Sequence, residues 1–195
     1  MTVLRSLTAA DAPAVRRVYG GVAATFLGRS AMTAQEAEEY VARVRGWAGA
    51  DPVEQYVLGV DVAGDLVGIV KLAHRPDGHG RVSYALREKR WGRGYATRAV
   101  EELVTFAFTT VGLDSLGARH HPGNPASGRV LEKAGFTRVG MVNGMIEYRL
   151  LEAVPGARLA ESLGDTLRIA ASRGGRLESE GCVVSGVRRP RRGPG

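Results

Sequence analysis

The chain has 195 residues, of which 44% are hydrophobic and 24% are charged, the ordinary composition of a globular domain with its own core. Its single cysteine, Cys182, excludes an intrachain disulfide and a four-cysteine zinc site. No apolar run approaches the roughly 18 residues that span a bilayer, and the N-terminus lacks the pattern of a secretory signal. We therefore expect a cytoplasmic protein with no membrane partner.

The net charge of +7 comes mainly from arginine, because only three of the 27 basic residues are lysines (Lys71, Lys89 and Lys133). Together with abundant alanine and glycine, this bias is typical of a GC-rich coding sequence rather than of selection for nucleic-acid binding. We expect no nucleic-acid partner, and a basic C-terminal arm is the alternative.

The N-terminal part of the chain is predicted to form one strand and two helices. Residues 3–7 are the strand, and Thr8 is the N-cap of the first helix. Thr33 and Glu36, three residues apart, form the capping-box pattern of a second helix that continues to about Trp47.

Three strands are predicted next. Residues 55–60 and 66–74 are joined by a hairpin turn at 63–65, and a second turn at 75–78 leads to the strand at 81–86.

Helix and strand then alternate. A helix at 96–110 precedes a strand at 116–120, and a second helix covers 124–135. The last two strands, within 137–150, are joined by Asn143-Gly144, the strongest two-residue hairpin signal. The order βααβββαβαββ indicates a mixed α/β domain.

This domain is expected to cover residues 1–152. Leucines repeat every four residues in 153–172, which predicts a short helix weakened by Gly164. Residues 173–195 are basic and rich in glycine and arginine, and we expect them to be disordered.

A glycine-rich turn, R-W-G-R-G-Y-A-T at residues 90–97, joins the strand at 81–86 to the following helix. Gly92 and Gly94 leave the backbone open to a ligand, and N–H groups at a helix start bind phosphate well. The turn therefore predicts a pyrophosphate site. A tight strand-to-helix connection with no ligand is the alternative.

A second motif lies about thirty residues downstream: N-P-A-S at 124–127, then Gly135-Phe136. The pair resembles the acetyl-CoA-dependent N-acetyltransferases of the GNAT superfamily, and most closely the branch of ribosomal-protein N-terminal acetyltransferases (RimJ/RimL). The resemblance covers about residues 1–150. It implies the GNAT fold, a central twisted, mostly antiparallel sheet with splayed central strands, flanked by helices.

The resemblance also implies which residues bind the acetyl donor, acetyl-CoA, and it implies no metal. The pyrophosphate would lie on the glycine-rich turn, and the pantetheine arm would run beside the end of the strand at 81–86. The N–H near Leu86 would polarise the thioester carbonyl. The implied contacts are Leu86, Trp91, Gly92, Arg93, Gly94, Tyr95, Ala96, Thr97, Asn124 and Ser127. For Asn124, a plain helix N-cap is the alternative.

Many relatives carry a tyrosine in the helix after Asn124 that protonates the departing thiolate, and this chain has none there. Ser127 occupies the place that a serine has in the RimJ/RimL branch, near the CoA sulfur, so it is the candidate acid. A hydroxyl of high pKa is a poor acid, so Ser127 as an orienting group is the alternative.

The general base is less defined. Some relatives have a glutamate five residues before the asparagine, where this chain has Arg119. His121 is on the same side of the strand end as Arg119 and titrates near neutrality, so it is the candidate base, against an exposed loop histidine as the alternative. Other candidates acting through ordered water are His74, His79, Glu54 and Glu88.

These features predict an enzyme that transfers an acetyl group to a primary amine by direct attack, without a covalent enzyme intermediate. The acceptor is a protein N-terminus or a small-molecule amine, and the resemblance slightly favours the first. A non-catalytic module that binds acyl-CoA is the rival. The resemblance leaves the oligomeric state open, with a homodimer as one alternative.

Overall fold

The computed structural model describes residues 2–48, 53, 55–75 and 77–152. The helix expected at 153–172, the basic tail at 173–195, Cys182 and the candidate base Glu54 lie outside the described residues. Among the described helices, none has the length and hydrophobicity that a bilayer crossing requires.

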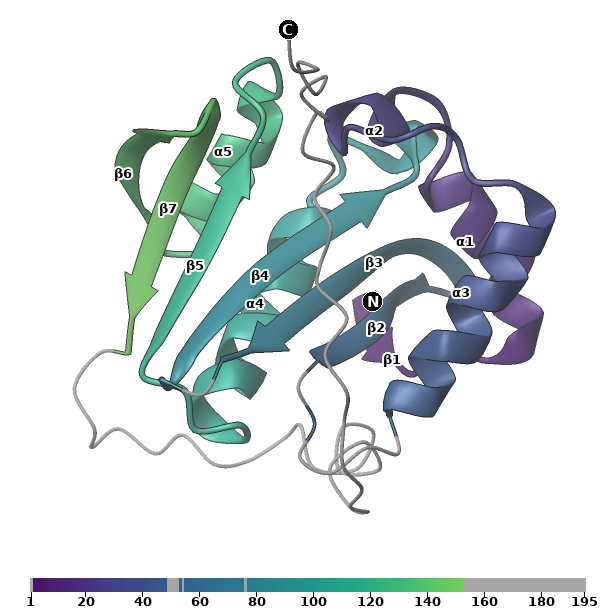
Figure 1. The fold of residues 1–195 in the computed structure, drawn as a ribbon, viewed down its shortest axis with the longest axis horizontal. Coiled ribbons are helices and arrows are strands. Elements are labelled where there is room, and N and C mark those ends of the chain that lie inside the picture. The colour runs from purple at the N-terminus through teal and green to yellow at the C-terminus, as the bar shows by residue number, and fades with distance from the viewer. Residues whose placement is uncertain (1, 49–52, 54, 76, 153–195) are drawn as a thin grey trace, which may run out of the picture.

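The centre of the fold is a seven-stranded sheet with the strand order β1-β2-β3-β4-β5-β7-β6 (Figure 1). Neighbouring strands are antiparallel except for β4 and β5, which are parallel. The strands are β1 (Thr2–Arg5), β2 (Gln55–Val62), β3 (Asp65–His74), β4 (His79–Leu86), β5 (Ser115–His120), β6 (Thr137–Val142) and β7 (Met145–Leu151).

Helices cover the two faces of this sheet unequally. The α-helices are α1 (Ala12–Val18), α2 (Gly21–Phe26), α3 (Ala34–Trp47), α4 (Tyr95–Thr109) and α5 (Pro125–Lys133), and short 3₁₀ helices are η1 (Ala9–Asp11) and η2 (Glu88–Arg90). In Figure 1, α4 and α5 lie behind the sheet, and α1 and α3 pack beside β1 to β3. No described helix lies in front of β4, β5 and β7.

Local sequence signals explain several of these elements. The capping box at the start of α3 is present, because Glu36 N donates to Thr33 Oγ1 (3.2 Å) and Thr33 N donates to Glu36 Oε2 (2.6 Å). The hairpin between β6 and β7 turns through Asn143 and Gly144, both with positive φ, as a type I′ turn requires.

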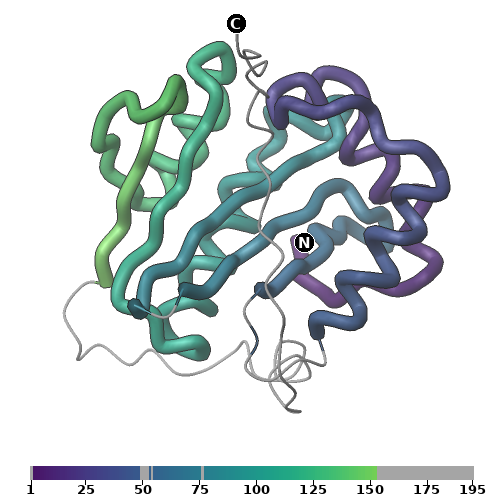
Figure 2. Tube along the Cα trace, in the orientation of Figure 1, coloured from purple at the N-terminus to yellow at the C-terminus, as the bar shows by residue number. Residues whose placement is uncertain are grey.

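The two central strands separate toward their C-terminal ends. β4 and β5 pair only from His79–Ser115 to Val82–Ala118, although β4 continues to Leu86 and β5 to His120. The tube in Figure 2 shows the two strands meeting at one end and diverging at the other. The predicted α/β fold with splayed central strands is therefore confirmed.

Two details differ from the sequence prediction. A further helix, α2, lies between the two helices predicted for the N-terminal part, and it places Phe26 over the open end of the sheet. β1 ends at Arg5 rather than at residue 7, because the chain turns there into η1, where Thr8 N donates to Asp11 Oδ2 (2.7 Å).

Candidate functional site

The glycine-rich turn lies at the C-terminal end of β4 and leads directly into α4. Gly92 (φ 72°) and Gly94 (φ 76°) are both left-handed, a conformation that favours glycine. Gly94 is the N-cap of α4 and has no side chain to accept the first N–H groups of the helix. These donors therefore point out of the helix end without an intrahelical partner, which is the arrangement that binds anions.

A cleft of about 290 Å³ opens beside this turn, between the end of β4, α2 and the start of α5. Every residue predicted to contact the acetyl donor lines it: Leu86, Trp91, Gly92, Arg93, Gly94, Tyr95, Ala96, Thr97, Asn124 and Ser127. The cleft also includes residues that are not among those predicted contacts: Ala23, Phe26, Leu27, Tyr84, Ala85, Arg90, Ala126, Arg129, Val130 and Lys133.

Leu86 directs its main-chain groups toward the gap between the strands. Arg87 N donates to Val67 O (2.9 Å) of β3. Main-chain groups of successive residues in a strand point to opposite sides, so the N–H and C=O of Leu86 point toward β5. The β4–β5 ladder ended at Val82, so the Leu86 N–H has no strand partner there. The Leu86 carbonyl accepts the Trp91 indole N–H (2.9 Å), which fixes the turn against the strand.

Tyr84 and Ser127 meet inside the cleft. The Tyr84 hydroxyl donates to the Ser127 carbonyl (2.9 Å) and lies 2.7 Å from Ser127 Oγ. Since the single phenol proton goes to the carbonyl, the Ser127 hydroxyl donates to the Tyr84 oxygen. Burial raises the pKa of Tyr84 to about 12, with the hydrogen bond from Ser127 acting in the opposite direction.

Asn124 begins α5 as predicted, because its Oδ1 accepts from Ser127 N (3.2 Å). This bond uses the side-chain oxygen and leaves the Asn124 amide N–H donors for another partner. The cap also fixes the first turn of α5, and with it the position of the Ser127 hydroxyl.

His121 lies at the open end of β5, outside the residues that line the cleft. Its Nδ1 accepts from Gly123 N (3.0 Å), so the neutral ring carries its proton on Nε2. The Phe26 ring lies 6.3 Å from His121 and 6.5 Å from Trp91, centroid to centroid. Phe26 thus bridges the ends of the two separated strands.

The two other candidate histidines lie away from Leu86, at the far end of β4. His74 pairs with Gly80 and His79 with Ser115, at the closed end of the splay. Leu86 is seven positions after His79 in β4, which is about 23 Å of extended chain. Glu88 is exposed in η2, on the side of the turn that faces Gly21. In the described part of the chain, His, Cys, Asp and Glu side chains form no cluster of three or more that suits a metal.

Comparison with known proteins identifies the same domain. Residues 2–137 match the family model described as an acetyltransferase (GNAT) domain. The chain is 30% identical over 66 residues to p20 of Bacillus licheniformis, and 29% identical over 80 residues to YoaA of Bacillus subtilis strain 168. Both are named as uncharacterized N-acetyltransferases. The alignments cover 34% and 40% of this chain and 37% and 45% of the two relatives, less than half of either.

Solved structures share the fold over a larger part of the chain. A proposed ribosomal-protein-serine acetyltransferase from Vibrio cholerae has a TM-score of 0.64 at 21% identity, covering 77% of this chain and 93% of that one. The spermidine N-acetyltransferase of Vibrio cholerae, in complex with CoA and spermine, has a TM-score of 0.65 at 18% identity, covering 77% and 95%. At these identities the likeness shows the fold alone.

Proposed function

This chain belongs to the acetyltransferase (GNAT) family, and we propose that it transfers an acetyl group from acetyl-CoA to a primary amine by direct attack. One observation carries the proposal: the gap between β4 and β5 is lined by the free Leu86 N–H and opens beside a helix start that can bind phosphate. A long substrate with a diphosphate at one end and a thioester at the other fits both features.

Acetyl-CoA would lie along the cleft, with its pyrophosphate at the start of α4 and its thioester beside the end of β4. The N–H groups at the start of α4 bind the pyrophosphate, with the Thr97 hydroxyl as a further donor. Arg93, Arg129 and Lys133 line the same cleft and supply positive charge for the phosphates. The pantetheine amides run beside β4, where the Asn124 amide N–H can bind them.

The Leu86 N–H then stabilises the oxygen of the thioester carbonyl as the amine attacks. A fixed main-chain donor aimed at developing negative charge is often the largest catalytic contribution. The N–C bond forms and the C–S bond breaks, so nitrogen must lose a proton and sulfur must gain one.

Ser127 gives its hydroxyl proton to the departing sulfur in this proposal, and Tyr84 restores it. The two oxygens lie 2.7 Å apart, so when the serine proton turns toward sulfur, the phenol proton turns from the Ser127 carbonyl to Ser127 Oγ and replaces it. Water returns the proton to Tyr84. Tyr84 comes from β4 rather than α5, and it offers a phenol although the helix tyrosine of many relatives is missing.

Loss of the amine proton needs little assistance when the acceptor is a protein N-terminus. An α-amino group has a pKa near 8, against about 10.4 for a lysine side chain, so it is appreciably neutral at pH 7. His121 could accept this proton only at Nδ1, which would cost it the bond from Gly123. We therefore propose that water carries the proton and that the His121 Nε2–H binds the acceptor.

A protein N-terminus is the acceptor that we propose, and a small-molecule amine is the alternative. Support comes from the motif resemblance to the RimJ/RimL branch alone, because the solved structures of similar fold include both a proposed ribosomal-protein-serine acetyltransferase and a spermidine acetyltransferase. The rival function, a non-catalytic acyl-CoA-binding module, would use the same cleft without turnover.

The test is CoA release from acetyl-CoA, measured by thiol titration with a panel of N-terminal peptides and small amines. We expect release to depend on an amine and to match the acetylated product in amount. CoA binding measured by calorimetry is the control. Tight CoA binding without release for any amine would refute the enzyme and support the binding module.

A further inference from the structure

We propose that the acceptor of this enzyme carries negative charge close to its amine. The inference rests on the proposed function and concerns the face of the sheet opposite α4. Four basic side chains gather on that face around the gap between β4 and β5, and we call them the cationic face: Lys71, Arg81, Arg119 and Arg149.

The strand registers place these four residues on one face. Val82 and Ala118 pack in the core beneath α4, so their neighbours Arg81 and Arg119 point to the opposite side. Arg149 follows the core residue Tyr148 in the same way. Lys71 adjoins the core residues Val70 and Leu72, and its Nζ lies on the other face, over the rings of Tyr19, directly after α1, and Tyr40 of α3.

One of these cations, Arg119, borders the gap itself, and Lys71 is one strand away from it. The last β4–β5 pair is Val82–Ala118, so the next residues on this face are Ser83 and Arg119, on either side of the opening. Lys71 pairs with Ser83 from β3. A substrate that reaches the thioester from this face therefore passes directly beside Arg119, with Lys71 one strand farther away on β3.

The other two cations lie one row deeper. Arg81 pairs with Gly117, and Gly117 pairs with Arg149 on its other side. Gly117 has no side chain of its own, and the His79 imidazole of β4 lies over it, with Nε2 3.0 Å from the position that a Cβ would take. An extended acceptor would meet this second row several ångströms from its amine.

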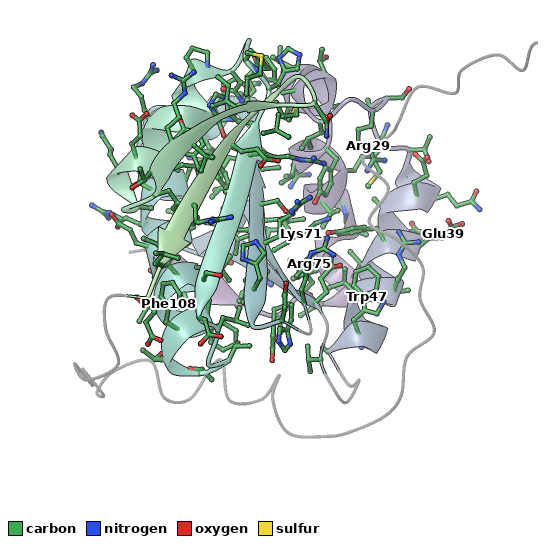
Figure 3. The ribbon with its side chains drawn as sticks, turned by 60° about the vertical axis from the view of Figure 1, so that its left-hand side comes forward. Arg29, Glu39, Trp47, Lys71, Arg75 and Phe108 are labelled. Atoms are coloured by element: carbon green, nitrogen blue, oxygen red, sulfur yellow. The ribbon has the colours of Figure 1, made fainter. Side chains whose placement is uncertain are left out.

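Little negative charge balances the cationic face. Among the residues that the structure describes, the ion pairs involve Arg5, Arg87 and Arg90, and none of the four cations. Glu147, the partner of Arg119 on β7, is the one carboxylate in these two rows. Figure 3 shows Lys71 and Arg75 on the part of the sheet near α3, and Arg75 adds a further exposed cation.

Lys71 is held in place by aromatic rings rather than by a carboxylate. Its Nζ lies 5.0 Å from the centre of the Tyr40 ring and 5.6 Å from that of Tyr19. Cation–π contacts leave the full positive charge in place while restricting where the ammonium group lies.

This arrangement has two consequences for an incoming amine. Cations near the gap repel polycationic acceptors and attract carboxylates, and the effect weakens with salt. They also disfavour protonation of the attacking amine, so more of it is neutral and nucleophilic. Arg119 occupies the position where some relatives have a glutamate base. It cannot accept a proton, but its positive charge also favours the neutral form of the amine.

The experiment compares acceptors of equal length that differ in charge. Peptides with serine at the N-terminus are followed by three aspartates, three asparagines or three lysines, and free aspartate and spermidine are the small-molecule arms. We expect kcat/KM for the acidic peptide to exceed that for the basic peptide at least tenfold at low salt, with the ratio falling at 0.5 M salt. The aspartate arm shows whether a peptide is needed.

Matched variants assign the preference to this face. Arg119→Gln and Arg81→Gln are each expected to reduce the acidic-to-basic ratio several-fold, and Arg119→Glu to reduce it further. Arg138→Gln is the control, because Arg138 pairs with Tyr148 and so lies on the opposite face of the same sheet. It removes the same charge and should leave the ratio unchanged.

Equal or better turnover of the basic peptide or spermidine would overturn the inference while leaving the acetyltransferase assignment intact. An unchanged ratio in both Arg119→Gln and Arg81→Gln would also overturn it. Absence of turnover with every acceptor, despite CoA binding, would instead refute the proposed function and this inference with it.

Discussion

Replacing Gly94 with alanine tests whether the turn before α4 binds the pyrophosphate. Gly94 has φ 76°, and a Cβ built there meets no atom within 4 Å, so the methyl group projects into open space. An alanine in the left-handed region costs about 1–2 kcal/mol of stability. A backbone shift that relieves this strain re-aims the N–H groups of the first turn.

The loss of one charge-assisted hydrogen bond costs about 1.5–3 kcal/mol, and 1.4 kcal/mol is tenfold in affinity. We therefore expect Gly94→Ala to raise the Kd for CoA at least tenfold in calorimetric titration. Gly144→Ala is the matched control, since Gly144 has φ 77°, equally open surroundings and a place in the β6–β7 turn outside the cleft.

Both variants should lose similar stability in thermal unfolding, and only Gly94→Ala should lose CoA affinity. The reasoning is refuted if Gly94→Ala binds CoA as the unaltered protein does. It is equally refuted if Gly144→Ala weakens binding to the same extent, because the effect would then follow from global destabilisation.

Two further predictions concern the proton donor and the ion pair at the start of the fold. Ser127→Ala should lower kcat about 100-fold and Tyr84→Phe about tenfold. The double variant should be no slower than Ser127→Ala, because the two hydroxyls act as a unit. Stopped-flow measurement of thiol release tests this, and a kcat for Ser127→Ala within about twofold of the unaltered value would exclude Ser127 as the acid. The Arg5 guanidinium, 2.8 Å from Asp11, lowers the pKa of that carboxyl to about 2. This lowered pKa stabilises the folded state above about pH 4, and the contribution is lost as the pH falls from 4 toward 2. Asp11→Asn should therefore cost about 1 kcal/mol at pH 7 and progressively less below pH 4 in chemical denaturation, whereas a constant difference across that range would contradict the pairing.

Much of the architecture could be predicted because local signals determine it. The capping box at Thr33 and the Asn143-Gly144 turn each depend on residues close in sequence. The glycine-rich turn could be found for the same reason, since Gly92 and Gly94 adopt the positive φ that their residue type favours.

Other features depend on contacts between distant segments. Tyr84 and Ser127 are 43 residues apart, and they meet only because β4 and β5 stop pairing where Tyr84 is reached. No periodicity or spacing in the sequence indicates where a parallel ladder ends. Helix α2 was missed because it is six residues long and begins among glycines, and the position of Phe26 over the gap follows from its packing against Trp91.

The role of His121 also could not be predicted from the sequence. Its residue type and position made it a candidate base, whereas its capacity depends on which ring nitrogen is free. The bond from Gly123 N to Nδ1 is made within a three-residue turn and decides the tautomer. A residue type alone does not specify that choice.

The most direct test of the whole account is a crystal structure with acetyl-CoA bound. We predict the diphosphate on the N–H groups of residues 92–97 and the thioester oxygen 2.7–3.1 Å from the Leu86 nitrogen, the range for an oxyanion donor. A cofactor bound elsewhere, or a thioester oxygen that faces away from β4, would contradict the role that we assign to the separated strands.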